Sequence, residues 1–581
     1  MSADSDGKRV EGLLSRAVVS LSSFVLIVLL LKEGYELIDQ PSLEVLATVV
    51  ISFVVFLSVG WDVLVWRRSD AAWSTARKLA PQSILLIPIV LLSENSAIWG
   101  LSVFLRQGIV VVVALSQTAR FRRYMDQLQA RPAKIFVLSF VLVIGLGALV
   151  LTFPRATVDG LGAKPIDAVF TSTSATCVTG LATLNTVDDA HAAADRQSFT
   201  PFGQFVILIL IQIGGLGIMT LSAATVMIAG RRLAMKSRAL MQSILDEHSA
   251  QALRKTVRDI FLMTFVIEGV GAALLTLRFW QLDYELGQAV WLGTFHAVSA
   301  FCNAGFSLFG DSLMSFRDDW IINGVHMALI LLGGLGFAVV TALAARRTWS
   351  GGFRVGWRRL SLQIRLVVAV TVMLIVAGTI FYFYLEYDRS LKGLDVGEKL
   401  LASLFHSVSF RTAGFNSVDM GEMSRAMMIL SCVFMFIGAC PGSTGGGIKT
   451  STVAVLFMSI RASMTSRADV EIGKHTVNPK VVTRAISIVA IAFSFLIVGL
   501  VLLMLSQPDI PFEALLFESV SALGTVGLSL GITPDLDGTG KVIIILLMFV
   551  GRLGPLTIAL AVGERQTNRG FRYSEERIVV G

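Results

Sequence analysis

Four short segments of this chain share a pattern that could bind a cation. Each begins with phenylalanine, continues through mostly small or hydroxyl-bearing residues, and ends on glycine; they are residues 170–180, 295–305, 405–414 and 517–527. From the Phe to the Gly is 10, 10, 9 and 10 residues by subtraction. The last residues of each segment are uncharged, and a glycine can adopt dihedral angles that a Cβ would obstruct. Rings of backbone carbonyl oxygens can replace the hydration shell of a monovalent cation, and this is the chemistry that such loops could perform.

We therefore predict that the four segments form four walls of one cation filter. A helix before each loop would point its partially negative C-terminal end at the ion, which favours a cation. The structural alternative is four re-entrant loops that serve only for packing. The candidate filter residues, which would bind the ion through their backbone carbonyl oxygens, are Val178, Thr179, Gly180, Asn303, Ala304, Gly305, Thr412, Ala413, Gly414, Thr525, Val526 and Gly527.

A glycine-rich stretch after the third segment resembles a phosphate-binding loop at first sight. Residues 438–450 read Gly-Ala-Cys-Pro-Gly-Ser-Thr-Gly-Gly-Gly-Ile-Lys-Thr, but Ile448 separates Gly447 from Lys449, so the P-loop spacing is not met. The stretch also interrupts an apolar run instead of following a strand. Unpaired backbone at membrane depth requires a water-filled cavity. We therefore predict a flexible, membrane-embedded loop beneath the filter.

A few ionisable residues fall inside apolar runs, where such residues are functional candidates by default. Arg552 would be an electrostatic barrier to cations or the partner of a carboxylate such as Glu518; a purely structural salt bridge is the alternative. For Glu268 we favour a packing role over that of a coupling-ion ligand. His296 and His406 occupy the same place in the second and third segments, and we expect hydrogen-bonded packing residues rather than proton carriers.

The composition is that of a polytopic membrane protein. The 581 residues are 54% hydrophobic and 15% charged, and the mean hydropathy is +0.73. The net charge of +8 does not indicate nucleic-acid binding, because the basic residues cluster in alternate connections between apolar runs. This is the positive-inside pattern, and it predicts a multi-pass protein of the cell membrane with both termini in the cytoplasm. The first apolar run has no cleavage pattern behind it and is predicted to be a retained anchor. The four cysteines lie in apolar surroundings without a CxxC spacing, so neither a disulfide framework nor a zinc site is expected.

The elements that would position these residues are apolar spans of about 20 residues. We expect an all-α fold with spans near 17–32, 43–66, 81–93, 98–117, 135–153, 203–229, 257–277, 321–345, 366–386, 425–458, 484–506 and 540–562. The 425–458 run is too long and too rich in glycine to be one straight helix. Around each filter segment the order is span, short re-entrant helix, filter and second span. The predicted units are an accessory N-terminal transmembrane module at 1–134 and repeats at 135–256, 257–363, 364–483 and 484–581, the last with a cytoplasmic tail.

Each second span carries a glycine cluster, at residues 214–217, 333–336, 438–442 and 551–554. Glycine in a membrane helix permits close backbone approach or a bend. Ordinary helix packing would explain any single cluster. Because the four clusters are in register, we expect a bend shared by all four units near the filter.

Five motifs together resemble one known family. They are residues 303–307 (Asn-Ala-Gly-Phe-Ser), 411–416 (Arg-Thr-Ala-Gly-Phe-Asn), 438–450, 524–527 (Gly-Thr-Val-Gly) and 551–557 (Gly-Arg-Leu-Gly-Pro-Leu-Thr). The chain resembles the Trk/Ktr/HKT superfamily of potassium transporters over about residues 135–565, with KtrB-type subunits most similar. The resemblance implies four membrane–pore–membrane repeats around one potassium pathway, and a homodimer. It also implies that the loop after the third filter is an intramembrane gate, with the candidate gate residues Gly438, Gly442, Ser443, Thr444, Gly445, Gly446, Gly447, Lys449 and Arg552.

The resemblance carries further expectations about ions and partners. In that family a glycine in all four filter segments goes with potassium selectivity, and this chain has all four, so bound K+ is expected with no covalent cofactor. Sodium is a candidate activator or co-ion. No nucleotide-binding domain is recognised in this chain, so a separate cytosolic RCK-type nucleotide-binding subunit is expected on the basic connections at 230–256, 346–365 and 460–484, with membrane lipids as the other partner.

Two features depart from the family pattern. The third filter segment is one residue shorter than the others, which predicts an irregular filter wall, and the N-terminal extension is longer than the KtrB core. A membrane-embedded enzyme or receptor is the competing class. The sequence contains no HExxH and no clustered carboxylates that an enzyme would need, and the N-terminal module has no recognisable ligand signature.

Overall fold

The computed structural model describes residues 132–187, 197–228, 250–350, 352–467, 469–472 and 475–554. The four spans predicted before residue 118, the accessory module that would contain them and the last part of the final span therefore lie outside the described residues. So do most of the first basic connection and the C-terminal tail.

The described part consists of helices joined by short turns, in the order that the repeats predict. The first unit has α7 (Pro132–Leu151), α8 (Pro165–Cys177) and α9 (Pro201–Ile228); the second has α11 (Ala250–Gln281), α12 (Leu286–Cys302), α13 (Trp320–Leu335) and α14 (Phe337–Ala344). The third unit has α17 (Leu362–Glu386), α18 (Val396–Ser409), α19 (Arg425–Phe436) and α20 (Thr450–Met464), and the fourth has α21 (Pro479–Ser506), α22 (Phe512–Gly524) and α23 (Gly538–Leu553).

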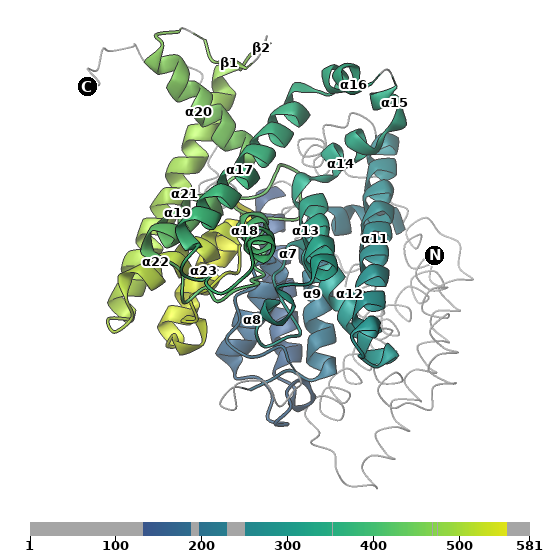
Figure 1. Ribbon diagram of the computed structural model, residues 1–581, viewed down its shortest axis with the longest axis vertical. Coiled ribbons are helices and arrows are strands. Elements are labelled where there is room, and N and C mark those ends of the chain that lie inside the picture. Colours follow the sequence, from purple (N-terminus) through teal and green to yellow (C-terminus); the bar gives the residue numbers. More distant parts are fainter. Residues whose placement is uncertain are drawn as a thin grey trace, which may run out of the picture.

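Short elements make up the connections between these helices. They are the helices α15 (Arg346–Trp349) and α16 (Phe353–Arg359), the antiparallel strands β1 (Glu471–Ile472) and β2 (His475–Thr476), and the 3-10 turns η3 (Pro154–Ala156), η4 (Met314–Phe316) and η5 (Thr533–Asp535). In Figure 1 α15, α16 and the β1–β2 hairpin lie at the upper end of the molecule. The turns that follow the four short helices α8, α12, α18 and α22 approach the opposite end.

Local sequence signals explain where the short helices begin. Pro165 starts α8, where a missing N–H costs no hydrogen bond. Asp395 and Glu398 form a reciprocal capping box at the start of α18. Asp319 caps α13 by accepting from the backbone N–H groups of Ile321 and Ile322, both at 2.9 Å. Because the starts of α8 and α18 are fixed, the C-terminal ends of these two short helices reach a defined depth.

The long helices are suited to a lipid environment. Three described helices are long and apolar enough to cross a membrane, within Val257–Gln281, Leu362–Glu386 and Pro479–Ser506, and the broken pair α13–α14 would make a fourth span. Only 28% of the best window of each long helix is buried inside the protein. Large apolar side chains such as Leu262 (63% exposed) and Met373 (60%) are therefore available to lipid tails. The chain is a membrane protein.

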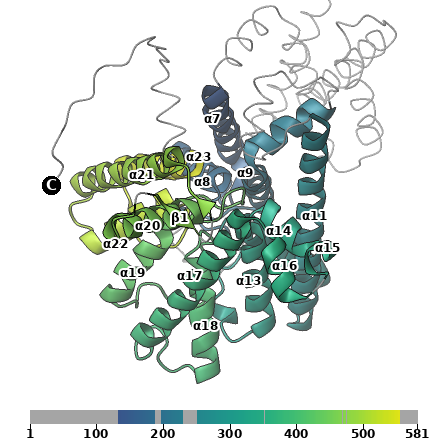
Figure 2. The same cartoon turned by 90° about the horizontal axis from the view of Figure 1, so that it is seen from above.

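The four units are arranged as a closed ring. Each short helix packs against the second span of the preceding unit: α12 against α9, α18 against α13, α22 against α19, and α8 against α23. Figure 2 shows the units around a common centre, with the α11–α13 unit on one side and α20–α23 on the opposite side. The last contact, between the fourth unit and the first, closes the ring.

The second spans bend at their glycine clusters, as the sequence predicts. Inside α9 the backbone leaves the helical region at Gly217, with φ of 74° and ψ of 139°. Gly336 has φ 89° and ψ 145° at the break between α13 and α14, where the two helix axes differ by 108°. Gly554 ends α23 with φ 83° and ψ 133°. In the third unit the break widens into the loop between α19 and α20. The 425–458 run is thus two helices, which confirms that it is not one straight span.

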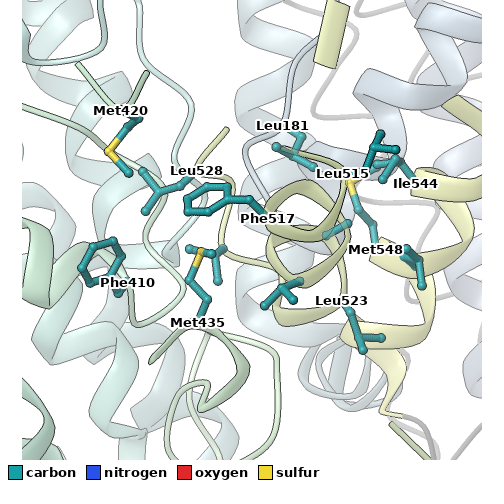
Figure 3. Close-up of a cluster of buried hydrophobic side chains, with 14 of the residues drawn as sticks. Leu181, Phe410, Met420, Met435, Leu515, Phe517, Leu523, Leu528, Ile544 and Met548 are labelled. Atoms are coloured by element: carbon teal, nitrogen blue, oxygen red, sulfur yellow. The ribbon is translucent and has the colours of Figure 1, made fainter. Parts of the chain in front are cut away.

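Two apolar clusters fill the space behind the short helices. One surrounds α8, α12 and the residues after the second filter segment. The other joins the third and fourth units, where Phe517 extends toward the side on which Phe410 and Met435 lie (Figure 3). Eleven of the chain's largest side chains in the described part, ten of them phenylalanines, are less than 2% exposed. Close packing of this kind leaves the short helices little freedom to move relative to the ring axis.

Candidate functional site: a ring of four glycines

The four predicted filter segments adopt one backbone conformation. The residue two positions before each glycine has a positive φ: 55° at Val178, 60° at Asn303, 70° at Thr412 and 50° at Thr525. The four glycines also have positive φ, at 99°, 72°, 81° and 95° for Gly180, Gly305, Gly414 and Gly527. Left-handed conformations are uncommon for residues other than glycine. Their fourfold recurrence shows that surrounding contacts hold these loops in one shape.

The four glycines form a ring, which we call the glycine ring. A Cβ placed on Gly180 would lie 2.5 Å from the carbonyl oxygen of Ala304, and one on Gly305 would lie 2.8 Å from that of Ala413. Likewise, Gly414 contacts the carbonyl oxygen of Val526, and Gly527 contacts that of Thr179. Each glycine therefore meets the carbonyl group of the residue before the next glycine. The contacts run from the first unit to the fourth and return to the first.

The serine in each repeated segment anchors its filter loop. In the first and fourth units the backbone N–H of the glycine donates to this serine, Gly180 to Ser174 Oγ at 3.0 Å and Gly527 to Ser521 Oγ at 3.1 Å. In the second unit Ser299 Oγ donates to the carbonyl of Phe306 at 2.7 Å, one residue beyond the glycine. Ser409 Oγ bonds the carbonyl of Phe415 in the same way at 2.5 Å. These bonds explain why serine recurs at this place in the sequence.

The shorter third segment does not produce an irregular filter wall. Thr412 and Gly414 have the same signs of φ as their counterparts, and both neighbours in the ring are contacted. The segment is one residue shorter because the C-terminal end of α18 is wound more tightly than the ends of the other short helices. Here Ala413 N–H bonds the carbonyl four residues earlier, that of Ser409, at 3.0 Å, whereas Ala304 N–H bonds the carbonyl five residues earlier, that of Ser299, at 2.8 Å. The predicted irregularity is therefore found in the helix end and is wrong for the filter residues.

The surroundings of the glycine ring suit a cation. The C-terminal ends of α8, α12, α18 and α22 point to it, and helix C-termini carry partial negative charge. A cavity of about 220 Å³ opens beside the ring and is lined by all four glycines. Its other lining groups are mostly uncharged polar residues and backbone, with Ser307, Asn416 and Ser529 among them. Among the described residues, no group of three or more His, Cys, Asp or Glu side chains could hold a metal ion.

The glycine-rich loop, residues 438–449, lies against the other side of the filter. A Cβ on Gly445 would contact Thr412 Oγ1, and one on Gly446 would contact Thr525 Oγ1. Thr444 Oγ1 donates to the carbonyl of Phe301 at 3.1 Å. The loop thus contacts three of the four units directly beneath the filter residues. Such close contact requires glycine, which explains the run of glycines in the sequence.

Two basic side chains hold the glycine-rich loop. Lys449 Nζ donates to the carbonyl oxygens of Gly445 and Gly446 at 2.7 and 3.3 Å, so the lysine caps its own loop. The guanidinium of Arg552 donates to the carbonyl oxygens of Thr444 and Gly214. It therefore joins the loop to the second span of the first unit. The structure brings the candidate gate residues together, from the loop between α19 and α20 and from α23.

The predicted pairing of Arg552 with Glu518 is wrong. Glu518 is fully buried in α22, and its carboxylate accepts hydrogen bonds from Ser529 Oγ at 2.8 Å and from Thr533 Oγ1. It therefore braces the chain that leaves the fourth filter segment. Arg552 is satisfied by backbone carbonyls on the opposite side of the filter. Sequence alone cannot reveal carbonyl partners, because every residue carries one.

The remaining buried polar residues behave as packing groups. Glu268 is 4% exposed, and both of its oxygens accept from Gln212 Nε2 at 3.2 Å. His296 Nδ1 pairs with the carbonyl of Leu292 at 2.9 Å, and Nε2 pairs with Ser307 Oγ at 3.1 Å. The ring of His406 stacks on that of Tyr382 with centroids 4.8 Å apart. The packing interpretation of these residues is consistent with all of these contacts.

Two side chains at the site were not predicted. The side chain of Asn303 lies between units: its amide nitrogen donates to the carbonyl oxygens of Ile330 and Phe301, both at 3.2 Å, and its other amide atom lies 3.3 Å from Thr412 Oγ1. Arg411 is 5% exposed, and its guanidinium lies 3.7 Å from the sulfur of Cys440 in the glycine-rich loop. An arginine within the third filter segment, directly before the filter residue Thr412, is the available sequence signal, since a buried charge needs a nearby partner.

Comparison with known proteins identifies the family to which the chain belongs. The family described as "TrkH: Cation transport protein" matches residues 102–568. The chain belongs to this family. The match begins within the region predicted as an accessory module, so the boundary at residue 134 stays a prediction. As a member of the TrkH family the chain is a transport protein and not an enzyme.

Curated relatives cover most of the chain. The Ktr system potassium uptake protein B of Vibrio alginolyticus is 36% identical over 458 residues, which are 78% of this chain and 96% of that protein. The protein of the same name from Bacillus subtilis (strain 168) is 36% identical over 452 residues, with 78% and 97% covered. The potassium/sodium uptake protein NtpJ of Enterococcus hirae is 35% identical over 458 residues, again with 78% and 97% covered.

A solved structure has the same fold. The crystal structure of the potassium transporter TrkH from Vibrio parahaemolyticus superposes with a TM-score of 0.61 and covers 89% of this chain and 98% of that one. The sequences are 19% identical, so this likeness concerns the fold alone. It agrees with the helical ring of TrkH-family repeats described above.

Proposed function

We propose that this TrkH-family protein is the potassium-translocating subunit of an uptake system. The observation that carries the proposal is the glycine ring, in which four carbonyl-bearing loops surround one axis beside a polar cavity. Potassium uptake by three relatives that are 35–36% identical, one of them named for potassium and sodium, supports the choice of ion. The ion would bind to the backbone carbonyls of the twelve predicted filter residues and pass through in single file, driven by its electrochemical gradient.

Potassium flux into liposomes containing the purified protein tests this function. Radioactive rubidium or potassium should accumulate in the liposomes, and excess unlabelled potassium should compete far better than sodium. The same measurement with and without sodium decides whether sodium activates the flux or moves with potassium. Absence of uptake from monodisperse, correctly inserted protein would contradict the proposal.

The glycine-rich loop would act as the gate of this pathway. Its contacts with Thr412, Thr525 and Phe301 support this proposal, because an ion leaving the proposed filter would meet the loop next. Lys449 and Arg552 hold it by hydrogen bonds to its carbonyl oxygens rather than by apolar packing. A loop held this way can move aside when the hydrogen bonds are exchanged for water. The proposed gate residues are therefore those predicted from the sequence.

The proposed system contains more than this chain. We propose a homodimer in the cell membrane with both termini in the cytoplasm, and a separate cytosolic RCK-type subunit that binds nucleotides. The β1–β2 hairpin within the 460–484 connection lies at the same end of the molecule as α15 and α16, and it is a suitable contact for that subunit. Co-purification of the two proteins, with and without adenine nucleotides, tests this contact.

A receptor function is the competing proposal for the part of the chain before residue 132. Growth of a potassium-uptake-deficient strain at low potassium separates the two classes. Restored growth supports transport, whereas a receptor would leave the growth defect unchanged.

A further inference from the structure

The connection between the second and third units has an unusual composition. Residues 346–361, which we call the arginine–aromatic connection, contain five arginines and no acidic residue. Three aromatic residues, Trp349, Phe353 and Trp357, recur at intervals of four. The connection includes α15 and α16, and its Gly351 lies outside the described residues. Neither the glycine ring nor the glycine-rich loop uses any of these residues.

The three aromatic rings form one stack. The centroids of Trp349 and Phe353 are 5.7 Å apart and their planes differ by 13°, while Phe353 and Trp357 are 6.2 Å apart and differ by 20°. Gly356 makes room for the first ring, since a Cβ there would lie 2.5 Å from a ring carbon of Trp349. Phe353 is nevertheless 72% exposed. The stack is therefore an ordered apolar ridge that the described protein leaves uncovered.

The connection is fixed at the end of the membrane helices. Thr348 Oγ1 donates to the carbonyl of Ala342 at 3.0 Å, and Trp349 Nε1 donates to that of Leu343 at 2.7 Å. These bonds satisfy carbonyls that the last turn of α14 would otherwise leave unpaired. Arg359 Nη1 donates to the carbonyl of Ser350 at 2.7 Å and closes the far end. The ridge is thus joined over a few residues to the end of α14 at Ala344 and to the start of α17 at Leu362.

Two exposed arginines lie beside the aromatic ridge. Arg354 and Arg358 are four residues apart, so they form a stripe along one side of α16, next to Phe353 and Trp357 in the helical order. No acidic residue within the connection neutralises them. The basic excess assigns this end of the molecule to the cytoplasm by the positive-inside rule. The cytoplasmic leaflet carries anionic headgroups, which attract arginines close to the membrane.

We propose that the arginine–aromatic connection is a binding site for anionic phospholipid. Arg354 and Arg358 bind the headgroup phosphate, which matches the planar guanidinium donors. Phe353 and Trp357 insert at the boundary between headgroups and acyl chains, where amphipathic aromatic rings are favoured. Arg359 and Gly356 are positioning residues that keep the stack in shape. The site reduces the surface that the 346–365 connection offers to a soluble subunit.

A lipid partner fits this surface better than a soluble protein. The ridge is joined at both ends to helices, α14 and α17, and has charges of one sign only. The β1–β2 connection differs on both counts, because it extends from α20 and carries Asp469 and Glu471 as well as Arg467. A cytosolic protein can approach the hairpin without contacting lipid.

Lipid retention by the purified full-length chain tests the site without measuring transport. The protein, in an uncharged detergent, is titrated with phosphatidylcholine micelles containing phosphatidylglycerol, and the lipid retained after size exclusion is quantified by mass spectrometry. The unmodified chain should retain phosphatidylglycerol in preference to phosphatidylcholine, and added salt should reduce this preference. The double variant R354Q/R358Q should bind phosphatidylglycerol about fivefold more weakly for each charge removed.

Matched variants keep the result interpretable. The double variant R258Q/R484Q removes the same charge from two exposed arginines at the same end, and it should retain phosphatidylglycerol like the unmodified chain. The variant R354K/R358K should retain most of the preference, since the charges remain. Unchanged phosphatidylglycerol retention by R354Q/R358Q would overturn the proposal. An equal loss in R258Q/R484Q would overturn it too, because the effect would then be one of total charge.

Discussion

At the scale of single residues, the proposed function depends on the absence of a Cβ atom at the four glycines of the ring. The glycine ring has no side chain at the four points where adjacent units meet, and each missing Cβ is replaced by a carbonyl oxygen of the neighbouring unit. The proposed filter would bind an ion through backbone geometry, so a substitution there would act by displacing carbonyl groups. A substitution of one of these glycines would also lower the free energy of unfolding, because a residue other than glycine is strained at a positive φ.

Gly180→Ser should lower the preference for potassium over sodium. Gly180 has φ of 99°, and a Cβ would lie 2.5 Å from the carbonyl oxygen of Ala304. We expect the potassium-to-sodium flux ratio to fall about tenfold, which corresponds to about 1.4 kcal/mol of lost discrimination. Gly145→Ser in α7 is the control, since nothing lies within 4 Å of a Cβ there. An unchanged flux ratio in Gly180→Ser would argue against the filter assignment.

Arg552→Gln should increase flux. The change removes hydrogen bonds from the guanidinium to the carbonyls of Thr444 and Gly214, which join the glycine-rich loop to the first unit. We expect rubidium uptake to rise about threefold or more, because loss of about 1 kcal/mol per hydrogen bond shifts the loop toward its open position. Thermal unfolding in detergent checks that the variant is folded. A folded variant with unchanged or reduced uptake would assign Arg552 a purely structural role.

The residue scale also shows what sequence can and cannot predict. The filter positions could be located because glycine, serine and phenylalanine recur with nearly constant spacing, and each has a local physical reason to be there. The partners of Arg552 could not, because its acceptors are backbone carbonyls on two other units. The same holds for Asn303, whose amide contacts Thr412 of the next unit.

At the scale of elements, the second spans connect the glycine ring to the glycine-rich loop that we propose as a gate. In three units the first glycine of the cluster lies against the end of its own short helix: Gly214 at Thr176, Gly333 at Phe301 and Gly551 at Leu523. Three residues later the backbone bends. The sequence predicted this shared bend from the register of the clusters. The sequence does not predict that the third segment is shorter because a backbone hydrogen bond at its helix end spans four residues instead of five. The length of the segment alone does not show where the residue is missing.

Gly336→Ala should destabilise the protein and disturb the glycine-rich loop. Gly336 has φ of 89°, and a Cβ would lie 2.6 Å from the carbonyl oxygen of Pro441. We expect a loss of about 1–3 kcal/mol in the free energy of unfolding, seen as a lower thermal transition in detergent. Gly324→Ala, in the same span α13, is the control. Gly324 is helical and no atom lies within 4 Å of a Cβ there, so we expect no loss of stability. There, replacing glycine by alanine should stabilise the helix by up to about 1 kcal/mol.

Shortening the glycine-rich loop should open the pathway. Deletion of residues 443–447 removes the loop's contacts with Thr412, Thr525 and Phe301. We expect rubidium uptake into liposomes to rise several-fold with selectivity retained, because the glycine ring is not part of the deleted segment. Normal expression with unchanged uptake would count against a gating role.

At the scale of the whole molecule, the ring closes only when the fourth unit packs against the first. One ion pair marks this closure: Lys541 Nζ, on α23, lies 2.7 Å from Asp167 Oδ1, on α8, and the two side chains are 14% and 7% exposed. The partners are 374 residues apart in the chain. The ring depends on packing between units that are distant in sequence. Its closure could therefore be expected from the presence of four repeats, whereas no local pattern specifies which residues meet there.

A double-mutant cycle on this pair measures the closure. Asp167→Asn and Lys541→Met alone should each lower the free energy of unfolding by about 1–3 kcal/mol, because each leaves a mostly buried charge unpaired. The double variant should lose less than the sum, with a coupling energy of about 1 kcal/mol. The exposed pair of Arg258 and Asp259, 67% and 42% exposed, should show no comparable coupling in the same thermal measurement. Strict additivity for the buried pair would mean that it does not stabilise the ring.

The contact of Gly527 with Thr179 has a consequence for how the protein is made. A ribosome delivers the first three units before α22 and α23 exist, and domains form in that order during synthesis. Until the last span is inserted, one side of the ring is missing and no continuous circle of oxygens can be present. The proposed ion pathway would therefore be completed in a single late step, and a chain that ends before the fourth unit would not form a selective ion pathway.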